Sequence, residues 1–322
     1  MLSGAIIGFG KIAQNSHIPA LPDLYNRGLN SKKFTGIKFY KSITDLFNNE
    51  KLDFVDITSP PLFHAEIIET AIKNNVNIIC EKPFTFNLYD ADKVSAKLKN
   101  KKLVFMPCHQ YKYAPLWKKF KEFIDESEEN SKFVFQSSVY RTEADFGLQV
   151  LNNPWRIKKE ISGGGILTDT GIHYLYLANW LVGKPKKLTA KIFNLRHNYS
   201  VEDTGCILLE YEKGIAEITL TWASGVRANF ASITSKHGNL IYSGKSELIK
   251  NLNNCKEKIS IPDISDKTTY NSLYVALFEE FIENLKNNNN SSLYIDEALD
   301  SIFLLEKCYE SAYGQKTIFL ND

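Results

Sequence analysis

The stretch GAIIGFGKIA at residues 4–13 decides the fold of the first half of the chain. The apolar run at 4–9 predicts a buried strand, and the residues after Gly10 predict a helix. The first glycine of such a loop allows a tight turn, the second lets backbone approach a pyrophosphate, and a small third residue lets the helix pack on the strand. The first N–H groups of the helix then face the phosphates. The stretch therefore predicts a dinucleotide-binding loop, although glycines after strands also occur in ordinary turns. The predicted cofactor contacts here are Gly8, Phe9, Gly10, Lys11, Ile12 and Ala13.

Short apolar runs alternate with helical patterns over the rest of the first third of the chain. The runs at 53–60, 75–83 and 102–111 predict strands, and 62–74 and 88–100 predict helices between them. Strands that alternate with helices form a parallel sheet covered by helices. We therefore predict an α/β fold that begins with a Rossmann domain at residues 1–118.

The pattern changes after residue 118, where longer segments show partial alternation of apolar and polar residues. Glu212-Lys213-Gly214 separates two such segments and predicts a hairpin turn. Two helices, at 270–287 and 296–312, end the chain. Residues 119–322 are predicted to form a substrate-binding and oligomerisation α/β domain with a large open sheet, mixed or antiparallel.

Composition excludes several classes of protein. The 322 residues are 43% hydrophobic and carry a net charge of +2, which argues against nucleic acid or an anionic membrane surface as a partner. The five cysteines form no CxxC pair, so neither a zinc site nor a disulfide framework is predicted. With no leader and no long apolar run, we expect a cytoplasmic protein with free thiols.

Two motifs follow predicted strands and therefore lie at the carboxyl edge of the sheet, where open parallel sheets bind ligands. TSPPLFH at 58–64 fits either a ligand loop or a plain turn in which His64 is incidental. Glu81-Lys82-Pro83 ends the next strand. A lysine there can orient a substrate hydroxyl or stabilise a developing alkoxide, or it can simply be a solvated charge.

The segment WRIKKEISGGGILTDTGIHYLYLANWL at 155–181 is the most informative part of the second half. Asp169 and His173 are four residues apart on a predicted helix and so share one face. Such a pair can hold a substrate hydroxyl and take its proton. The alternatives are an acidic residue favoured by the helix dipole beside a hydrogen-bonded histidine, and a metal pair, for which the sequence shows no further ligand cluster.

Taken in order, GFGKIA, TSPPLFH, EKP, HQYKYAP and WR followed by GGGILTDTGIH resemble the Gfo/Idh/MocA family. These oxidoreductases are named for glucose-fructose oxidoreductase, inositol dehydrogenase and the rhizopine-catabolism protein MocA. The resemblance covers nearly the whole chain. It implies NAD or NADP as cofactor, hydride exchange with a sugar, cyclitol or related polyol, and a homodimer or homotetramer formed through the C-terminal sheet.

The resemblance also implies roles for individual residues. Lys82, Asp169 and His173 fall on the family's catalytic positions, and we expect Lys82 and His173 to act on one substrate. The substrate contacts it implies are Lys82, Trp155, Arg156, Asp169 and His173. The further cofactor contacts it implies are Thr58, Ser59, Pro60, His64, Glu81 and Lys82.

Three departures from the family pattern stand out. Lys112 occupies a segment in which family members usually carry arginine, and Tyr176 stands where many carry an acid. Residues 22–34 contain no apolar run, so the second strand and the acid that binds the adenosine ribose are predicted to be missing. Lys32 and Lys33 could meet a 2′-phosphate or be solvated. This departure favours an alternative function, a non-catalytic member that binds a dinucleotide or sugar for regulation.

Overall fold

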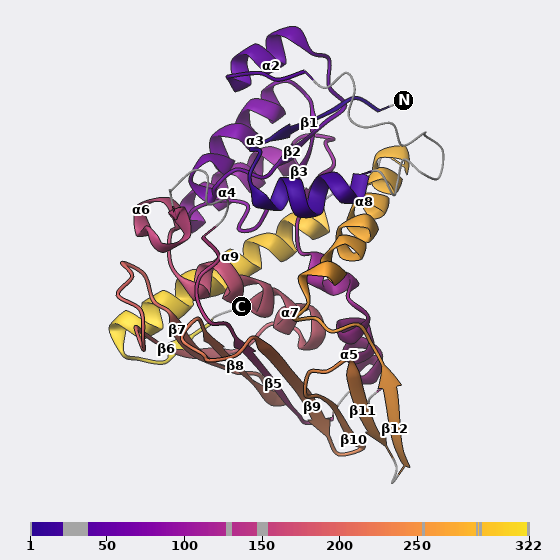
Figure 1. The fold of residues 1–322 in the computed structure, drawn as a ribbon, viewed down its shortest axis with the longest axis vertical. Helices are drawn as coiled ribbons and strands as arrows, with labels where there is room; N and C mark the ends of the chain where they lie inside the picture. Colours follow the sequence, from indigo (N-terminus) through magenta and orange to yellow (C-terminus); the bar gives the residue numbers. More distant parts are fainter. Residues whose placement is uncertain are drawn as a thin grey trace. The chain divides into compact units, whose positions relative to one another are not determined.

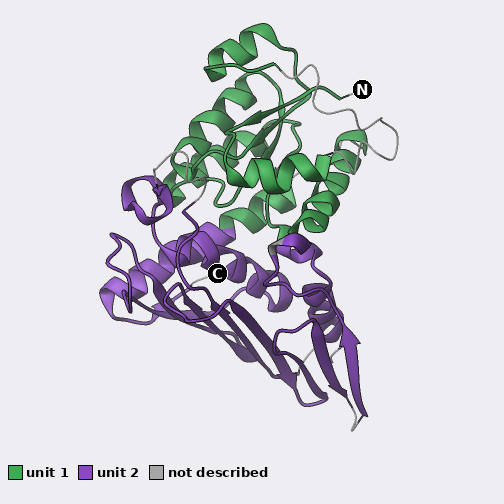
Figure 2. Ribbon diagram, in the orientation of Figure 1, with its two compact units in different colours: residues 1–110, 147–152, 270–299 green, residues 111–146, 153–269, 300–322 purple. Residues whose placement is uncertain are grey.

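The computed structural model describes residues 2–21, 38–126, 131–146, 154–252, 255–287, 289 and 292–320 (Figure 1). The chain forms two compact units (Figure 2). The first comprises residues 1–110, 147–152 and 270–299, and the second comprises 111–146, 153–269 and 300–322. This division differs from the predicted boundary after residue 118, chiefly because the segment 270–299 returns to the first unit.

The first unit contains a parallel sheet of four strands in the order β1-β2-β3-β4. The strands are β1 (Gly4–Ile7), β2 (Phe54–Ile57), β3 (Asn77–Cys80) and β4 (Phe105–Pro107). All four were predicted from their apolar runs. The register pairs Ile7 with Ile57 and Ile57 with Cys80, so the residues after β1, β2 and β3 leave the sheet at one edge.

The prediction that the first strand is buried is only partly right. The strand forms, but Ala5, Ile6 and Ile7 are half-exposed, whereas the three residues Val55–Ile57 of β2 are buried. The reason is that β2 is the one strand paired with β1 among the described residues. The predicted absence of a second strand and of its acid concerns residues 22–34, which lie outside the described part.

Helices of the first unit follow the predicted pattern. The helix at 11–21 contains a π-helical segment, η1 (Ala13–His17). The others are α2 (Ile43–Asn49), η2 (Pro61–Phe63), α3 (His64–Lys73), α4 (Leu88–Lys99) and α8 (Tyr270–Asn287); α9 (Ser292–Gly314) crosses from the first unit into the second after residue 299. α3 forms where a helix was predicted and buries Ile67, Ile68, Ala71 and Ile72, whose spacing places them on one face. The described residues just before α2, 38–42, form no strand.

The second unit is built on a sheet of nine strands in the order β12-β11-β10-β9-β5-β8-β7-β6-β13. Its strands are β5 (Phe133–Tyr140), β6 (Lys187–Phe193), β7 (Thr204–Glu210), β8 (Gly214–Thr221), β9 (Ala228–Ser235), β10 (Gly238–Tyr242), β11 (Glu247–Leu252), β12 (Cys255–Ser260) and β13 (Ile318–Phe319). Among the described strands of this sheet, only β5 and β8 pair in parallel, so the sheet is mixed. The predicted hairpin turn joins β7 to β8, where the Tyr211 N–H donates to the Gly214 carbonyl at 2.8 Å.

Helices α5 (Pro115–Asp125) and α7 (Ile172–Val182) pack on one face of this sheet (Figure 1). The shorter helical elements of the unit are η3 (Gln110–Tyr113, which begins in the first unit), η5 (Trp155–Ile157), α6 (Lys159–Ser162), η6 (Leu167–Gly171) and η7 (Lys267–Thr269). Trp117 of α5 contacts Tyr174 of α7 and Phe135 of β5, with ring centroids 6.0 and 6.3 Å apart. Eight of the eleven residues of α7 are buried, so this helix belongs to the core of the second unit.

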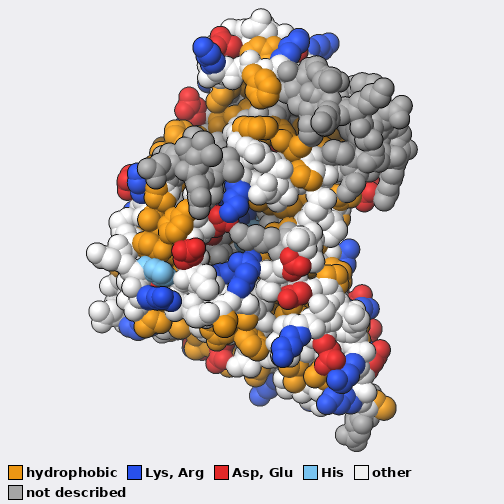
Figure 3. All heavy atoms as spheres, viewed as in Figure 1, with side chains coloured by type: hydrophobic (Ala, Val, Ile, Leu, Met, Phe, Trp, Pro, Cys, Tyr) orange, Lys and Arg blue, Asp and Glu red, His pale blue; other side chains and the backbone are white. Residues whose placement is uncertain are grey.

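The surface of the described residues carries no broad charged region on the face drawn in Figure 3, where acidic and basic side chains are interspersed. No helix in the described part is both long and apolar enough to span a membrane. All five cysteines lie in the described part and are free thiols.

Candidate active site

The glycine-rich loop after β1 has the backbone geometry that its sequence predicts. Gly8 has φ +106°, a conformation that L side chains rarely adopt, and a Cβ there would lie 2.5 Å from the backbone nitrogen of Ser59. The Thr58 hydroxyl donates to the Gly8 carbonyl, and the Thr58 N–H donates to the Ile7 carbonyl at 2.9 Å. The loop is therefore packed directly against the residues that follow β2.

Gly10 differs from Gly8, because a Cβ built on it would meet no atom of the described residues within 4 Å. Glycine at this position is thus not required by packing, and the space beside it is open to a ligand. Ala13 is fully buried, as expected for the residue that lets the helix pack on the strand. The loop and the first turn of the helix at 11–21 fit a dinucleotide pyrophosphate, which would lie on their backbone N–H groups. Phe9 is 56% exposed.

His64 joins the two loops at the carboxyl edge of the sheet. It is fully buried, and its Nδ1 lies 2.8 Å from the Pro83 carbonyl oxygen while its Nε2 lies 2.7 Å from that of Ser59. Burial lowers the pKa of His64, so the neutral ring donates a hydrogen to one of the two carbonyls at a time. His64 is therefore not incidental: it holds the TSPPLFH and EKP loops together.

Glu81 points into the interior of the first unit. Its Oε1 accepts hydrogen bonds from His17 Nε2 at 2.9 Å and from the Tyr274 hydroxyl at 2.6 Å, and its Oε2 accepts one from the Lys82 N–H at 3.1 Å. His17 is fully buried and donates from Nδ1 to Asp56 Oδ2 at 2.8 Å. These bonds to the protein involve both carboxylate oxygens of Glu81. The predicted contact of Glu81 with the cofactor stays a prediction.

The charges in this cluster stabilise one another. Burial alone lowers the pKa of His17, but the carboxylates of Asp56 and Glu81 outweigh burial and raise it to about 10. Burial alone raises the pKa of Glu81, but the hydrogen bond and positive charge of His17 lower it to about 2. At neutral pH His17 is therefore an imidazolium and Glu81 a carboxylate.

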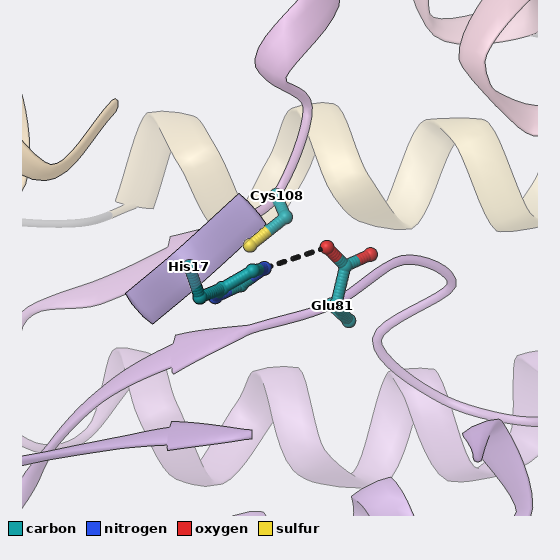
Figure 4. Close-up of side chains that lie close together, drawn as sticks. All are labelled: His17, Glu81 and Cys108. Carbon is teal, nitrogen blue, oxygen red and sulfur yellow. Dashed lines mark hydrogen bonds and ion pairs between the residues drawn. The ribbon is translucent and has the colours of Figure 1, made fainter. Parts of the chain in front are cut away.

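Cys108 lies beside this pair (Figure 4). The ligand atoms of His17, Glu81 and Cys108 all lie within 4.8 Å of one another, as a metal site would require. However, both ring nitrogens of His17 already donate to carboxylates, and burial raises the pKa of the Cys108 thiol well above its usual value. The arrangement is that of a hydrogen-bonded ion pair beside a neutral thiol.

In the second unit, Asp169 and His173 come from one continuous helical segment. Asp169 lies in the π-helical η6, and its Oδ1 accepts a hydrogen bond from Arg156 Nε at 3.1 Å. His173 lies in the first turn of α7, is 5% exposed, and stacks on the Tyr111 ring at a centroid distance of 4.3 Å. A carboxylate paired with arginine and an imidazole held against an aromatic ring can bind a hydroxyl and exchange its proton.

Trp155 and Arg156, which the family resemblance assigns to substrate binding, lie beside this pair. The guanidinium of Arg156 stacks on the Trp155 ring, 4.3 Å from its centroid, and Arg156 Nη1 donates to the Asp145 carbonyl at 3.3 Å. Both residues are half-buried. Arg156 thus links the WR segment to Asp169, while the contact of either residue with a substrate stays a prediction.

Sequence reasoning missed Glu202 and Tyr309, which support the helix that carries Asp169 and His173. Glu202 Oε1 accepts hydrogen bonds from the N–H groups of Gly165 and Leu167 at 2.9 and 3.1 Å and from the Tyr309 hydroxyl at 2.8 Å. A Cβ on Gly165 would overlap the Glu202 carbonyl, and one on Gly164 would overlap the Tyr309 hydroxyl. Two of the three glycines are therefore required by close packing, a signal that sequence spacing does not carry.

The structure groups the predicted residues into two sets. The first unit holds the glycine-rich loop with Thr58, His64 and Lys82, and the second holds Asp169 and His173. That Lys82 and His173 act on one substrate stays a prediction. Tyr176, which stands where many family members carry an acid, is 2% exposed and packs in the core.

Two family models match the chain. Residues 2–109 match the model described as an oxidoreductase family with an NAD-binding Rossmann fold, and residues 119–241 match the GFO/IDH/MocA C-terminal domain. With the α/β fold and the glycine-rich loop described above, these matches define an NAD-binding oxidoreductase. The chain belongs to the Gfo/Idh/MocA family.

Curated relatives include named dehydrogenases. The chain is 26% identical over 258 residues to an uncharacterised protein of Saccharomyces cerevisiae, covering 74% of this chain and 72% of the relative. It is 26% identical over 227 residues to D-apiose dehydrogenase of Paraburkholderia graminis, covering 67% and 59%. Levoglucosan dehydrogenase of Pseudarthrobacter phenanthrenivorans is 30% identical over 147 residues, covering 45% and 36%. The chain thus spans less than two thirds of the length of both named dehydrogenases.

Solved structures share the fold over the whole chain. An oxidoreductase from Agrobacterium radiobacter in complex with NAD+, L-tartaric acid and magnesium has a TM-score of 0.82 at 21% identity, covering 99% of this chain and 98% of its own. Levoglucosan dehydrogenase in complex with NADH and levoglucosan has a TM-score of 0.82 at 16% identity and full coverage of both chains.

Proposed function

We propose that this protein is a dehydrogenase that transfers a hydride between NAD or NADP and a CH–OH group of a sugar, cyclitol or related polyol. The observation that carries the proposal is the pair on one helical segment, Asp169 bonded to Arg156 and His173 stacked on Tyr111. The substrates named for its relatives, apiose and levoglucosan, support the substrate class.

The residues of the chain divide the work. The glycine-rich loop binds the cofactor, which supplies the hydride acceptor or donor when bound. His173 takes the proton of the substrate hydroxyl at its ring during oxidation and returns it during reduction. Asp169, anchored by Arg156, orients the hydroxyl or the imidazole. The ammonium of Lys82 orients the reacting oxygen and stabilises its developing negative charge.

We also propose that the protein is cytoplasmic and forms a homodimer or homotetramer through the nine-stranded sheet. Five free thiols suit a reducing compartment.

The proposed oligomer contact rests on one face of the sheet, because directly opposed residues of a sheet share a face. The pairs Ser138–Phe230, Gln136–Ser232 and Ser232–Ile241, with Val134 two residues before Gln136, therefore place the exposed apolar side chains of Val134, Phe230 and Ile241 on one face. Light scattering should give a mass of two or four chains, and Phe230→Glu should lower it; a monomeric wild type contradicts this part.

Turnover tests the chemistry. A panel of pentoses, hexoses and inositols is assayed with NAD and with NADP by the absorbance of the reduced cofactor. Lys82→Ala and His173→Ala should each reduce turnover by about two to four orders of magnitude, the usual contribution of a general acid–base group. Lys73→Ala, an exposed lysine on α3, and His237→Ala, in the turn after β9, are the matched controls.

Two outcomes would contradict the proposal. Near-normal turnover in both variants would move the chemistry to other residues. Cofactor and sugar binding without turnover on any member of the panel would instead favour the regulatory function that the sequence leaves open.

A further inference from the structure

The hydrogen bonds around Glu81 and Lys82 form one connected system in the first unit. Glu81 directly precedes Lys82, and its Oε2 accepts the backbone N–H of Lys82 at 3.1 Å. The Glu81 N–H continues the sheet by donating to the Ile57 carbonyl at 2.8 Å. On the other side of Lys82, the Pro83 carbonyl lies 2.8 Å from His64 Nδ1. The backbone of Lys82 is therefore held on both sides.

The Glu81 side chain is itself fixed by two donors from distant parts of the chain. His17 Nε2 donates from η1 at 2.9 Å and the Tyr274 hydroxyl donates from α8 at 2.6 Å, both to Oε1. The His17 ring also lies against the Tyr274 ring, with centroids 4.5 Å apart, and its Nδ1 donates to Asp56 of β2. Three donors hold the Glu81 carboxylate, and each ring nitrogen of His17 donates to a carboxylate, so moving either side chain to another rotamer would break hydrogen bonds of buried polar groups.

We propose that His17 and Tyr274 are positioning residues for Lys82, acting through the carboxylate of Glu81. The hydrogen bonds from His17 and Tyr274 hold the Glu81 carboxylate in one rotamer. Because this carboxylate also accepts a hydrogen bond from the Lys82 N–H, the same bonds restrain the backbone of Lys82. Two helices therefore fix the position of the Lys82 backbone: the helix at 11–21, which carries His17, and α8, which carries Tyr274. This inference rests on the role proposed for Lys82 in the reaction.

The primary variant is Tyr274→Phe, because it removes one donor from Glu81 and keeps every charge and ring. Tyr294→Phe is its matched control: it lies in the same unit and removes a hydrogen bond of similar length, from Tyr294 to Glu280 at 2.7 Å. His17→Gln leaves Asp56 and Glu81 buried without a cation and is expected to be unstable. It is therefore compared with His17→Gln/Glu81→Gln, in which a neutral amide pair replaces the ion pair.

Two measurements report on Lys82. The first is the rate at which acetylating reagent modifies Lys82 in the cofactor-free protein, followed by peptide mass spectrometry, and it requires no turnover. The second is the split between kcat and the dissociation constant of NADH. In Tyr274→Phe the acetylation rate should change several-fold and kcat should fall about tenfold, the scale of one lost hydrogen bond to a charged group, with NADH affinity within about twofold of wild type. Tyr294→Phe should change none of these.

The two proposals fail in different ways. If Lys82→Ala abolishes turnover while Tyr274→Phe matches Tyr294→Phe in acetylation and kcat, the positioning role is overturned and the proposed function stands. If Lys82→Ala turns over normally while Tyr274→Phe still alters Lys82 acetylation, the positioning network stands and the proposed function falls. Stoichiometric zinc in the purified protein, lost in Cys108→Ser, would also overturn this inference, since His17 would then be a metal ligand.

Discussion

The two glycines of the loop, Gly8 and Gly10, differ in whether the fold or the ligand requires a glycine. Gly8 combines a positive φ with a close approach to Ser59, so any side chain there disturbs the backbone. Gly10 has neither constraint. Both glycines were predicted to contact the cofactor, yet the structure gives them different physical reasons to be glycine, and a substitution at Gly10 is therefore the cleaner probe of the ligand.

We expect Gly10→Val to abolish measurable binding of NADH, because its side chain would occupy the place of the pyrophosphate. Its melting temperature should stay close to that of the wild type, whereas Gly8→Ala should lower it. Fluorescence titration with NADH and calorimetric melting check both points. Unchanged NADH affinity in Gly10→Val would show that the loop is assigned to the wrong ligand.

At the scale of elements, two of the helices that carry candidate residues contain a π-helical segment just after a glycine-containing loop. These segments are η1, which ends at His17, and η6, which contains Asp169. A π-helical segment shifts the direction of the residues around it, and such segments are frequent at functional sites. The four-residue spacing of Asp169 and His173 therefore spans a change from π- to α-helix, so the prediction of a shared face, which assumed a regular α-helix, stays a prediction.

Glu202 caps the start of the second of these helical segments, and its charge state makes that element sensitive to pH. Burial raises the pKa of Glu202, so the folded state binds its proton more tightly than the unfolded state. Its contribution to the free energy of unfolding therefore falls as pH rises from the ordinary value of 4.5 through the raised folded pKa. Protonated Glu202 at low pH therefore stabilises the fold, and its ionisation toward neutral pH lowers the free energy of unfolding.

We expect Glu202→Gln to fold at neutral pH, because an amide oxygen can accept the same three donors that converge on Oε1. Relative to wild type, its free energy of unfolding should rise as pH increases from 4.5 to 8, whereas Glu202→Ala should lose about 3 kcal/mol by leaving buried donors without an acceptor. Urea unfolding at several pH values measures both, with Glu210→Gln on β7 as control. A pH-independent difference between Glu202→Gln and wild type would contradict the raised pKa.

At the scale of the whole molecule, the chain is a Gfo/Idh/MocA oxidoreductase whose first sheet has β1 at its edge among the described strands. The ribose-binding acid expected of a Rossmann domain is predicted to be missing from residues 22–34, which lie outside the described part. Without such an acid, nothing distinguishes a free ribose 2′-hydroxyl from a phosphate. The predicted loss of this acid is therefore what bears on the preference between NAD and NADP.

We expect weak binding of cofactor with little preference between NAD and NADP. Calorimetric titration of both reduced cofactors gives the two dissociation constants directly. The variant Lys32→Ala/Lys33→Ala tests whether these lysines contribute to any binding of the 2′-phosphate. Tight binding with strong selectivity for NAD would mean that another acid contacts the ribose.

The sequence by itself determined the features that depend on residues close to one another along the chain. The strand–glycine–helix start, the order of strands and helices in the first unit and the hairpin between β7 and β8 follow from local periodicity and turn chemistry, and all are present. Even the burial of α3 was predictable from its apolar spacing. The candidate catalytic residues were named from short motifs and from the family resemblance these motifs carry, and their roles stay predictions.

Only the tertiary structure decided which partners those motifs use. The His17 bonds to Asp56 and Glu81 join residues 39 and 64 positions apart, and the Tyr274 bond to Glu81 spans 193 positions. A buried polar group must find a hydrogen-bond partner, but which one it finds depends on how helices and strands pack, not on its neighbours in sequence. The support of Lys82 in the first unit, and that of Asp169 and His173 by Glu202 in the second, therefore became visible only in the folded chain.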